Sequence, residues 1–325
     1  MTSRRQFLSG LACASMGAPF VALAQAKPVR IDILGPVPFK ETVYAAGVAQ
    51  GFADLGYRDG SRMQLEYRSA DGKEDLYRRQ ARELVDLNCD LYIVLGAEAP
   101  VRILQELKPR APIAFLAVDY DPLERKIVSD LRRPDRNTTG VYVPQNSLVA
   151  KRMEVLREAL PAAKRVVVFA DRFSSVQVPG AHQGARSARF EVSVVEFSQQ
   201  PYDYAGQLDS ARKSGADAFM TLASPVFARE RQAISEILLR NRMPGIGTAT
   251  VQAEAGYLLA LGTLVPKVTR RLADVGVRLL KGARPADIPV EQADEFELTI
   301  NAKTAKALGI RIPESVLARA SRIVS

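Results

Sequence analysis

The sequence predicts an α/β protein of two Rossmann-like lobes, each built on a doubly wound sheet. Short, continuous apolar stretches alternate with helical patterns in two successive runs along the 325-residue chain. Such stretches are typical of parallel strands that helices cover on both faces. Residues 137–144 close the first run, and the second run opens just beyond them. We therefore interpret this stretch as the first crossover between the lobes.

The first run starts with an apolar strand that is followed by an amphipathic helix. Tyr44, Val48 and Phe52 recur at helical spacing, which places them on one face. Gly56 is suited to end this helix, because glycine readily adopts the left-handed conformation of a C-terminal cap. The strands predicted in this run are 29–34, 63–67, 91–95 and 113–118, and the helices are 44–55, 76–88, 100–107 and 123–131.

The second run repeats the same alternation. Its predicted helices are 148–160, 181–189, 204–214 and 227–240, and its strands are 166–169, 192–197, 218–222 and a short one around Ile246. A strand at 257–261, a helix at 266–281 and the tail remain to be divided between the lobes. Three hinge crossovers would assign 27–143 plus 256–290 to the first lobe and 144–255 plus 291–325 to the second.

The first 26 residues have the features of an export signal. Arg4 and Arg5 form a twin-arginine motif, an apolar segment follows at 7–23, and small residues precede a cleavage point after Ala26. An ordinary amphipathic helix fits less well, because glycine and proline interrupt the segment. Cys13 is a poor lipid attachment site, since Gly10 stands where leucine is preferred. We expect a soluble periplasmic protein in which Cys89 is the remaining thiol.

Composition and motifs disfavour an enzyme, a metal site and a nucleic-acid partner. The net charge is +9, but the Lys and Arg residues are scattered along helices, as expected of solvated faces. His182 is the only histidine, and no P-loop, catalytic triad or zinc motif is present. We expect no cofactor, and we expect a monomer.

Polar and aromatic residues follow the predicted strands, at the edge where open α/β sheets bind ligands. An amino acid would suit them, because hydroxyls and helix-end amides hold a carboxylate, an acid takes the ammonium and a ring covers the side chain. The candidate ligand-binding residues are Phe39, Ala97, Glu98, Asp119, Tyr120 and Asp121 in the first lobe, and Phe173, Ser174, Ser175, Ser224, Phe227 and Thr248 in the second.

Several candidates also have a purely structural interpretation. Asp121 and Ser224 each precede a proline, as N-cap residues often do. The phenylalanines are equally suited to pack under loops. Glu98 is the strongest candidate, since a carboxylate at a helix start has no structural need to face a cleft, although simple solvent exposure would also explain it.

The tail resembles that of the ABC transporter substrate-binding family that includes tryptophan-binding-type proteins. The segments that carry this resemblance are Phe296-Glu297-Leu298-Thr299-Ile300-Asn301-Ala302-Lys303-Thr304-Ala305-Lys306-Ala307-Leu308-Gly309, then Ile312-Pro313 and Leu317-Ala318-Arg319-Ala320. Weaker matches extend over the mature chain, including Phe52-Ala53-Asp54-Leu55-Gly56-Tyr57 and Asn137-Thr138-Thr139-Gly140-Val141.

This resemblance implies a type I periplasmic binding fold with three hinge strands, which delivers a solute to an inner-membrane permease with a cytoplasmic ATPase. Two positions depart from the family pattern. After the third strand the family commonly has Gly-Thr or Gly-Ser, whereas this chain has Gly96-Ala97-Glu98. After the fourth strand it commonly has Gly-Asp-Pro, whereas this chain has Asp119-Tyr120-Asp121-Pro122. The added acids suggest a ligand with more positive character, so we do not transfer tryptophan to this chain.

Three functions are compatible with these features. The favoured one is capture of a small solute by closure of the two lobes. A sensory subunit that docks on a membrane receptor has the same sequence features. A periplasmic hydrolase on the same scaffold would turn over its solute.

Overall fold

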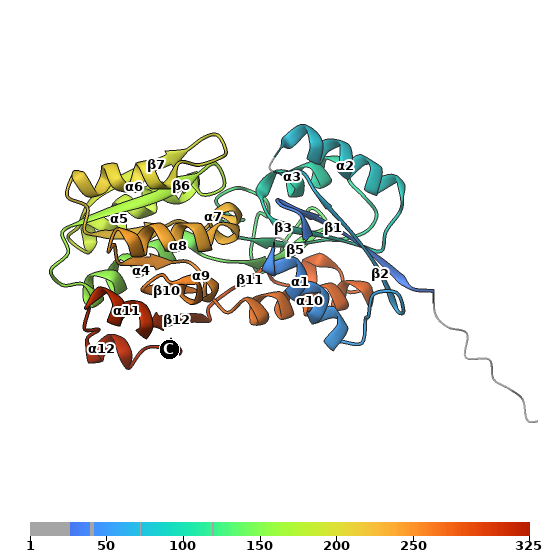
Figure 1. The fold of residues 1–325 in the computed structure, drawn as a ribbon. Helices are drawn as coiled ribbons and strands as arrows, with labels where there is room; N and C mark the ends of the chain where they lie inside the picture. The colour runs from blue at the N-terminus through green and yellow to red at the C-terminus, as the bar shows by residue number, and fades with distance from the viewer. Residues whose placement is uncertain (1–26, 40–41, 72, 119) are drawn as a thin grey trace, which may run out of the picture.

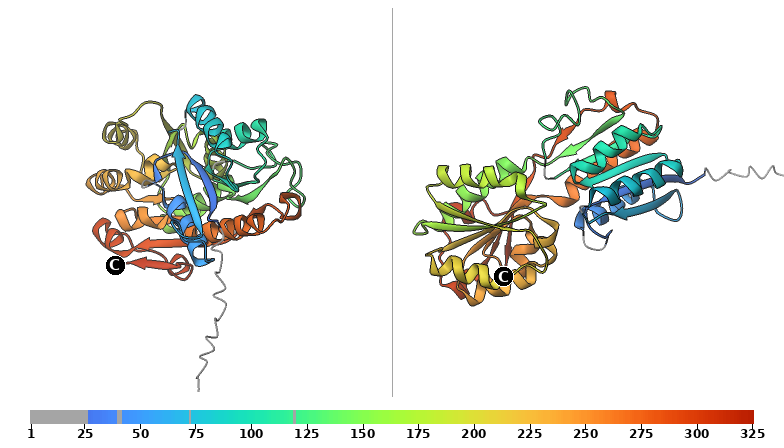
Figure 2. Two further views of the ribbon diagram at one scale, coloured as in Figure 1. Left: turned by 90° about the vertical axis from the view of Figure 1, so that its right-hand side faces the viewer. Right: turned by 90° about the horizontal axis from the view of Figure 1, so that it is seen from above.

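The computed structural model describes residues 27–39, 42–71, 73–118 and 120–325, and it contains two lobes side by side (Figure 1). The predicted export signal lies outside these residues. Each lobe is built on one sheet, and the view from above shows the two bodies joined by extended segments (Figure 2). Both are doubly wound, so the predicted fold class is confirmed.

The sheet of the first lobe is wholly parallel, with the order β11-β5-β4-β3-β1-β2. Helices α1 and α10 cover one face, and α2 and α3 cover the other. The strands are β1 (Val29–Gly35), β2 (Met63–Ser69), β3 (Leu91–Gly96), β4 (Ile113–Ala117), β5 (Thr138–Tyr142) and β11 (Glu291–Gln292). The helices are α1 (Val43–Asp54), α2 (Glu74–Asp86), α3 (Glu98–Leu107) and α10 (Val265–Leu280).

The sheet of the second lobe has the order β13-β12-β10-β9-β8-β6-β7, and only the β10–β12 pair is antiparallel. Its strands are β6 (Arg165–Asp171), β7 (Glu191–Phe197), β8 (Ala218–Thr221), β9 (Gly245–Gly247), β10 (Leu259–Thr263), β12 (Phe296–Asn301) and β13 (Arg322–Val324). Its helices are α4 (Gln145–Ala159), α5 (Val178–Ser187), α6 (Tyr204–Lys213), α7 (Pro225–Arg229), α8 (Arg231–Arg240), α9 (Thr250–Ala255), α11 (Ala302–Leu308) and α12 (Glu314–Leu317).

The chain passes between the sheets three times, but two of the passages differ from the predicted positions. Strand β10 was assigned to the first lobe, yet it pairs with β9 and β12 in the second sheet. Strand β11 was assigned to the second lobe, yet it pairs with β5 in the first. The passages therefore follow β5, β10 and β11. Periodicity identifies a strand, but it does not reveal which sheet supplies its hydrogen-bond partner.

The predicted helix at 123–131 is wrong, because this segment forms turns instead. The Asp121 side chain accepts hydrogen bonds from the backbone of Leu123 and Glu124, and Lys126 has a φ of +54°. A left-handed residue interrupts a helix. The apolar pattern reflects burial of Ile127 and Val128 against the lobe core.

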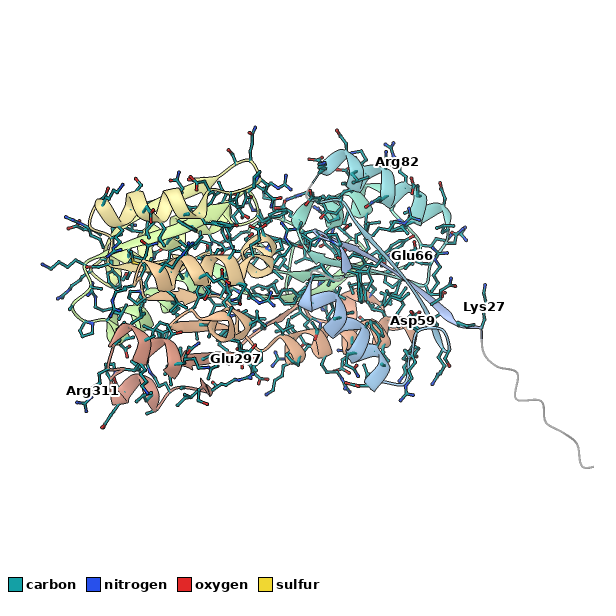
Figure 3. All side chains as sticks on the ribbon, viewed as in Figure 1. Lys27, Asp59, Glu66, Arg82, Glu297 and Arg311 are labelled. Carbon is teal, nitrogen blue, oxygen red and sulfur yellow. The ribbon has the colours of Figure 1, made fainter. Side chains whose placement is uncertain are left out.

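The surface charges are distributed over both lobes. Figure 3 labels Lys27 and Arg82 on the first lobe and Arg311 at the far end of the second. In the part of the chain that the structure describes, no helix is long and apolar enough to cross a membrane. Cys89 is a buried free thiol, and burial raises its pKa to about 12. Reagents that attack thiolates should therefore spare it in the native protein.

Asp32 makes the stability of the first lobe depend on pH. Its side chain is fully buried on β1, and this burial raises the carboxyl pKa above the ordinary 3.8, although Arg30 at 2.9 Å opposes the shift. The folded state thus binds the proton more tightly than the unfolded state. The stability that protonated Asp32 contributes is complete below the pKa of this carboxyl in the unfolded chain. It is lost as the pH rises through the higher pKa of the same carboxyl in the folded protein.

The variant Asp32→Asn should lose this pH dependence. The wild type loses stability from this carboxyl as the pH rises from 4 to 7, and the variant does not. The free energy of unfolding of the variant minus that of the wild type should therefore be larger at pH 7 than at pH 4, as measured by urea denaturation. An equal difference at both pH values would contradict the assignment.

Candidate functional site

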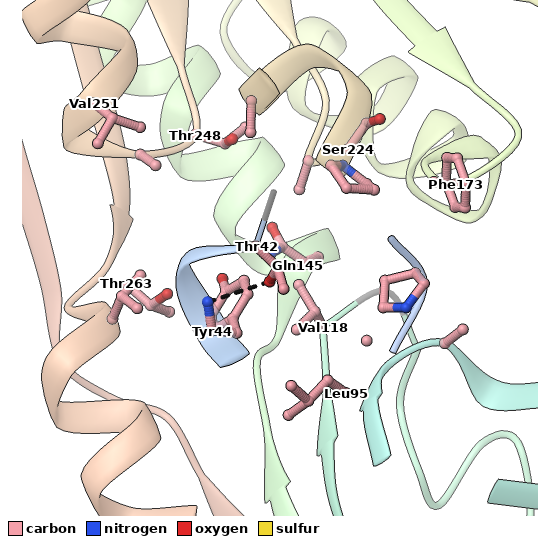
Figure 4. Close-up of a pocket in the computed structure, with 18 of the residues that line it drawn as sticks. Thr42, Tyr44, Leu95, Val118, Gln145, Phe173, Ser224, Thr248, Val251 and Thr263 are labelled. Carbon is pink, nitrogen blue, oxygen red and sulfur yellow. Dashed lines mark hydrogen bonds between the residues drawn. The ribbon is translucent and has the colours of Figure 1, made fainter. Parts of the chain in front are cut away.

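A cavity of about 170 Å³ lies between the lobes, at the carboxyl ends of the strands (Figure 4). Its walls come from the segments after β1, β3 and β4 in the first lobe and after β6, β8 and β9 in the second. Most of the lining is apolar. The polar residues of the lining are Thr42, Tyr44, Gln145, Ser224, Arg231, Thr248 and Thr263. An apolar cavity of roughly 150 Å³ can hold a benzene molecule, so this one suits a small solute.

The end of β3 illustrates how the backbone shapes the cavity wall. Gly96 has a φ of +81°, a conformation that residues with a side chain rarely adopt. A Cβ added there would lie 3.4 Å from Pro36. The glycine therefore turns the chain from β3 into α3 and keeps the wall close to Pro36.

Ser224 is held in the opposite wall by its cap position and by a buried acid. Its Oγ accepts from the Val226 N–H at 3.1 Å and donates to Asp171 Oδ2 at 2.5 Å. The other oxygen, Oδ1, accepts from Ser174 Oγ at 2.9 Å and from Phe173 N at 3.1 Å. Burial raises the Asp171 pKa, and these hydrogen bonds oppose the rise.

A buried arginine lies behind the start of α4. The Arg152 side chain is fully buried and donates through Nε to Leu261 O at 2.8 Å and through Nη2 to Gln145 Oε1 at 3.3 Å. Burial lowers its pKa to about 10. Nearby, Tyr44 is hydrogen-bonded to Thr263, and burial raises the tyrosine pKa. Gln145, Tyr44 and Thr263 all line the cavity close to a hinge crossover.

Four of the candidate residues lie in the cavity lining, namely Ala97, Phe173, Ser224 and Thr248. Ser174 lies behind the wall as a partner of Asp171, and Ser175 is exposed.

The remaining candidates have other contacts. Glu98 pairs with Arg102 and lies 3.5 Å from Arg125. Tyr120 is buried and tilted against Phe115, with ring centroids 6.5 Å apart. Asp121 accepts hydrogen bonds from the backbone of the turn that follows it.

The two other phenylalanines pack against rings of their own lobe. Phe39 lies edge-on to Tyr67 with centroids 5.3 Å apart, and Phe227 is fully buried in an aromatic cluster with Tyr204. Asp119 lies outside the described residues.

Sequence reasoning missed Tyr44, Gln145 and Thr263. Tyr44 was interpreted as part of the apolar face of α1, and the predicted strand and helix bounds excluded the other two. A signal was nevertheless present, because Gln145 immediately follows the crossover and begins a helix that starts at the cavity.

An ion pair joins the lobes beside Phe173 of the cavity wall. Arg172 Nη2 donates to Asp71 O at 2.6 Å and lies 3.5 Å from the Asp71 carboxylate. Both side chains are about half exposed. This contact fits a closed arrangement of the lobes, but solvent screens it.

The variant Arg172→Ala should therefore weaken ligand binding only slightly. Exposed pairs contribute at most about 1 kcal/mol, or roughly fivefold in affinity. Calorimetric titration measures the change, with the exposed Arg186→Ala on α5 as the control. A loss above roughly thirtyfold, about 2 kcal/mol, would mean that this pair has a larger role.

A profile of the family described as "ABC transporter substrate binding protein" matches residues 40–324. This chain belongs to that family. It is therefore a substrate-binding protein of an ABC transporter and not an enzyme.

Three relatives illustrate the likeness. A tyrosine-binding protein of Clostridioides difficile (strain R20291) is 24% identical over 270 residues, which cover 82% of this chain and 76% of that protein. An ABC domain from Streptococcus pneumonia, solved in complex with L-Trp, is 24% identical with a TM-score of 0.78, covering 91% of this chain and 100% of that one. A ligand-free, open substrate-binding protein with adhesive properties from Clostridium difficile is 22% identical with a TM-score of 0.66, covering 91% and 99%. The type I binding fold of this substrate-binding protein is thus confirmed.

Proposed function

We propose that this substrate-binding protein works in the periplasm, where it captures an amino acid or a similar small solute between its lobes and presents it to an ABC permease. The single observation that carries the proposal is the cavity whose walls come from both lobes. A solute that touches both walls stabilises their approach, and the closed form is then the one that a permease recognises. The twin-arginine signal supports the periplasmic location.

The cavity chemistry favours an amino acid with an apolar or aromatic side chain. Leu95, Val118 and Phe173 provide apolar walls, while hydroxyls and one amide provide hydrogen bonds. The ligands in the names of the relatives, tyrosine and L-Trp, support the same class. Within the proposed site, Ala97, Phe173, Ser224 and Thr248 contact the solute together with Tyr44 and Gln145.

A ligand screen tests this proposal. The mature protein is heated with amino acids, organic acids, amines and short peptides, and hits are measured by calorimetry. A ligand at about 100 times its Kd should add about 2.7 kcal/mol of stability. Glu98→Ala serves as a control that retains binding, because its carboxylate is already paired. If no solute of these classes raises the melting temperature, the proposed function is wrong.

A further inference from the structure

Two buried charges lie directly behind polar residues of the cavity wall. Asp171 lies behind Ser224, and Arg152 lies behind Gln145. Both charged side chains are almost completely buried, with exposed fractions of 2% and 0%. Asp171 and Arg152 each use one hydrogen-bonding group of the wall residue beside them. They therefore determine whether that residue can offer a donor or an acceptor to a ligand.

Ser224 is left with an acceptor. Its hydroxyl proton is donated to Asp171 at 2.5 Å, and one lone pair accepts from Val226 N. Three donors converge on Asp171, and such hydrogen bonds favour the ionised carboxylate. The free lone pair of Ser224 therefore lies next to a buried negative charge, which is a suitable environment for an ammonium group.

Gln145 is left with a donor. A guanidinium has no acceptor, so the Gln145 atom that faces Arg152 must be the carbonyl oxygen. The amide nitrogen then points away from Arg152 and has no protein partner among the described residues. The charge of Arg152 is also uncompensated, since Nη1 lacks a partner and no carboxylate of the described residues acts on the guanidinium. A ligand carboxylate at Gln145 would satisfy the amide and lie near the positive charge.

We propose that the cavity binds an α-amino acid zwitterion in one orientation, with the carboxylate at Gln145 over Arg152 and the ammonium at Ser224 over Asp171. This inference rests on the proposed function and specifies its ligand. The apolar walls at Leu95, Val118 and Phe173 then remain for the side chain.

Arg231 is the competing cation in the lining. It is only half-buried, and its Nη1 already donates to Ala228 O at 2.8 Å. Water screens such a partly exposed charge more than it screens a buried one. Arg231 is therefore the alternative partner for the carboxylate, and its replacement distinguishes this assignment from the one to Gln145.

The test uses two sets of probes that differ only in their charged groups. L-tyrosine is compared with tyramine and 3-(4-hydroxyphenyl)propionate, and L-leucine with isopentylamine and 4-methylpentanoate. Calorimetry of the wild type should give one amino acid that binds at least about tenfold more tightly than both of its analogues, because each analogue loses a charge-assisted contact.

Three variants separate the two ends of the site. Gln145→Glu replaces the donor with an acceptor, and the new carboxylate pairs with Arg152, so the fold should be retained. It should weaken the amino acid at least about fiftyfold and preserve binding of the amine. Asp171→Asn should weaken the amino acid and the amine but not the deaminated acid. Arg231→Gln should change each affinity by less than about threefold.

The orientation is wrong if Gln145→Glu leaves amino acid binding intact, if an amine binds the wild type as tightly as its amino acid, or if Arg231→Gln causes the loss instead. A wild-type protein that closes on a solute without a carboxylate would overturn the orientation but preserve the proposed function. Failure of all solutes in the wider screen would overturn both.

Discussion

Replacing Ala228 with tryptophan should abolish ligand binding and leave the fold intact. Ala228 lies on α7, is partly exposed and lines the cavity. A tryptophan ring needs more room than a benzene molecule and would occupy most of a space of about 170 Å³. We expect the affinity to fall at least about a hundredfold, which corresponds to about 2.7 kcal/mol, as measured by calorimetry with the best ligand of the screen.

The matched control is Ala205→Trp, which places the same ring on the exposed face of α6. It should bind like the wild type and melt at a similar temperature. If Ala228→Trp retains a Kd within about threefold of the wild-type value, the ligand does not occupy this cavity.

Replacing Gly140 with alanine should strongly destabilise the first lobe. Gly140 lies in β5 between β4 and β11, and a Cβ added there would lie 2.1 Å from Phe115 O and 2.8 Å from Phe115 N. Backbone atoms of a central strand cannot move aside without breaking the sheet. We expect a loss of about 4 kcal/mol or more in the free energy of unfolding, measured by urea denaturation.

Gly282→Ala separates this clash from backbone strain. Gly282 has a φ of +92°, but no atom lies within 4 Å of an added Cβ. The cost there should be only about 1–2 kcal/mol. Equal losses for both variants would show that the contact with Phe115 is not the cause. Because β5 leads directly into the crossover before Gln145, a soluble Gly140→Ala protein should also bind ligand more weakly.

The alternation of strands and helices was enough to predict both lobes, because each element follows from local spacing of apolar residues. The tail residues around Phe296 were specific enough to predict the family. The sheet to which β10 belongs was not predictable in this way. Its partner β12 lies more than 30 residues further along the chain, and the choice between two apolar sheet edges depends on tertiary packing.

The sequence predicted a cavity at the strand ends better than it predicted the individual side chains that line this cavity. The rule that ligands bind at strand ends led to Ala97, Phe173, Ser224 and Thr248, which line the cavity between the lobes. That a ligand binds there stays a prediction. Glu98 comes from the same region, but its carboxylate pairs with Arg102 and Arg125. Arg125 lies in the segment 123–131, which forms turns although the sequence predicted a helix there. Of the added acids, only Asp119 then remains as a reason to expect a more positive ligand, and it lies outside the described residues.

The departure from the family at the fourth strand has a structural explanation for two of its residues. Tyr120 packs into the core of the first lobe, and Asp121 stabilises a turn. Such uses of polar and aromatic residues follow from contacts that only the folded chain brings together.

The measurement that tests closure most directly is the distance between the lobes with and without ligand. Spin labels are attached at Arg82→Cys on α2 and Ser210→Cys on α6, two exposed positions on opposite lobes. Cys89 stays unlabelled, because it is buried and its pKa is raised to about 12. Saturation with the best ligand of the screen should replace a broad distance distribution by a shorter, narrower one. If calorimetry shows full occupancy and the distribution does not change, capture by closure is contradicted.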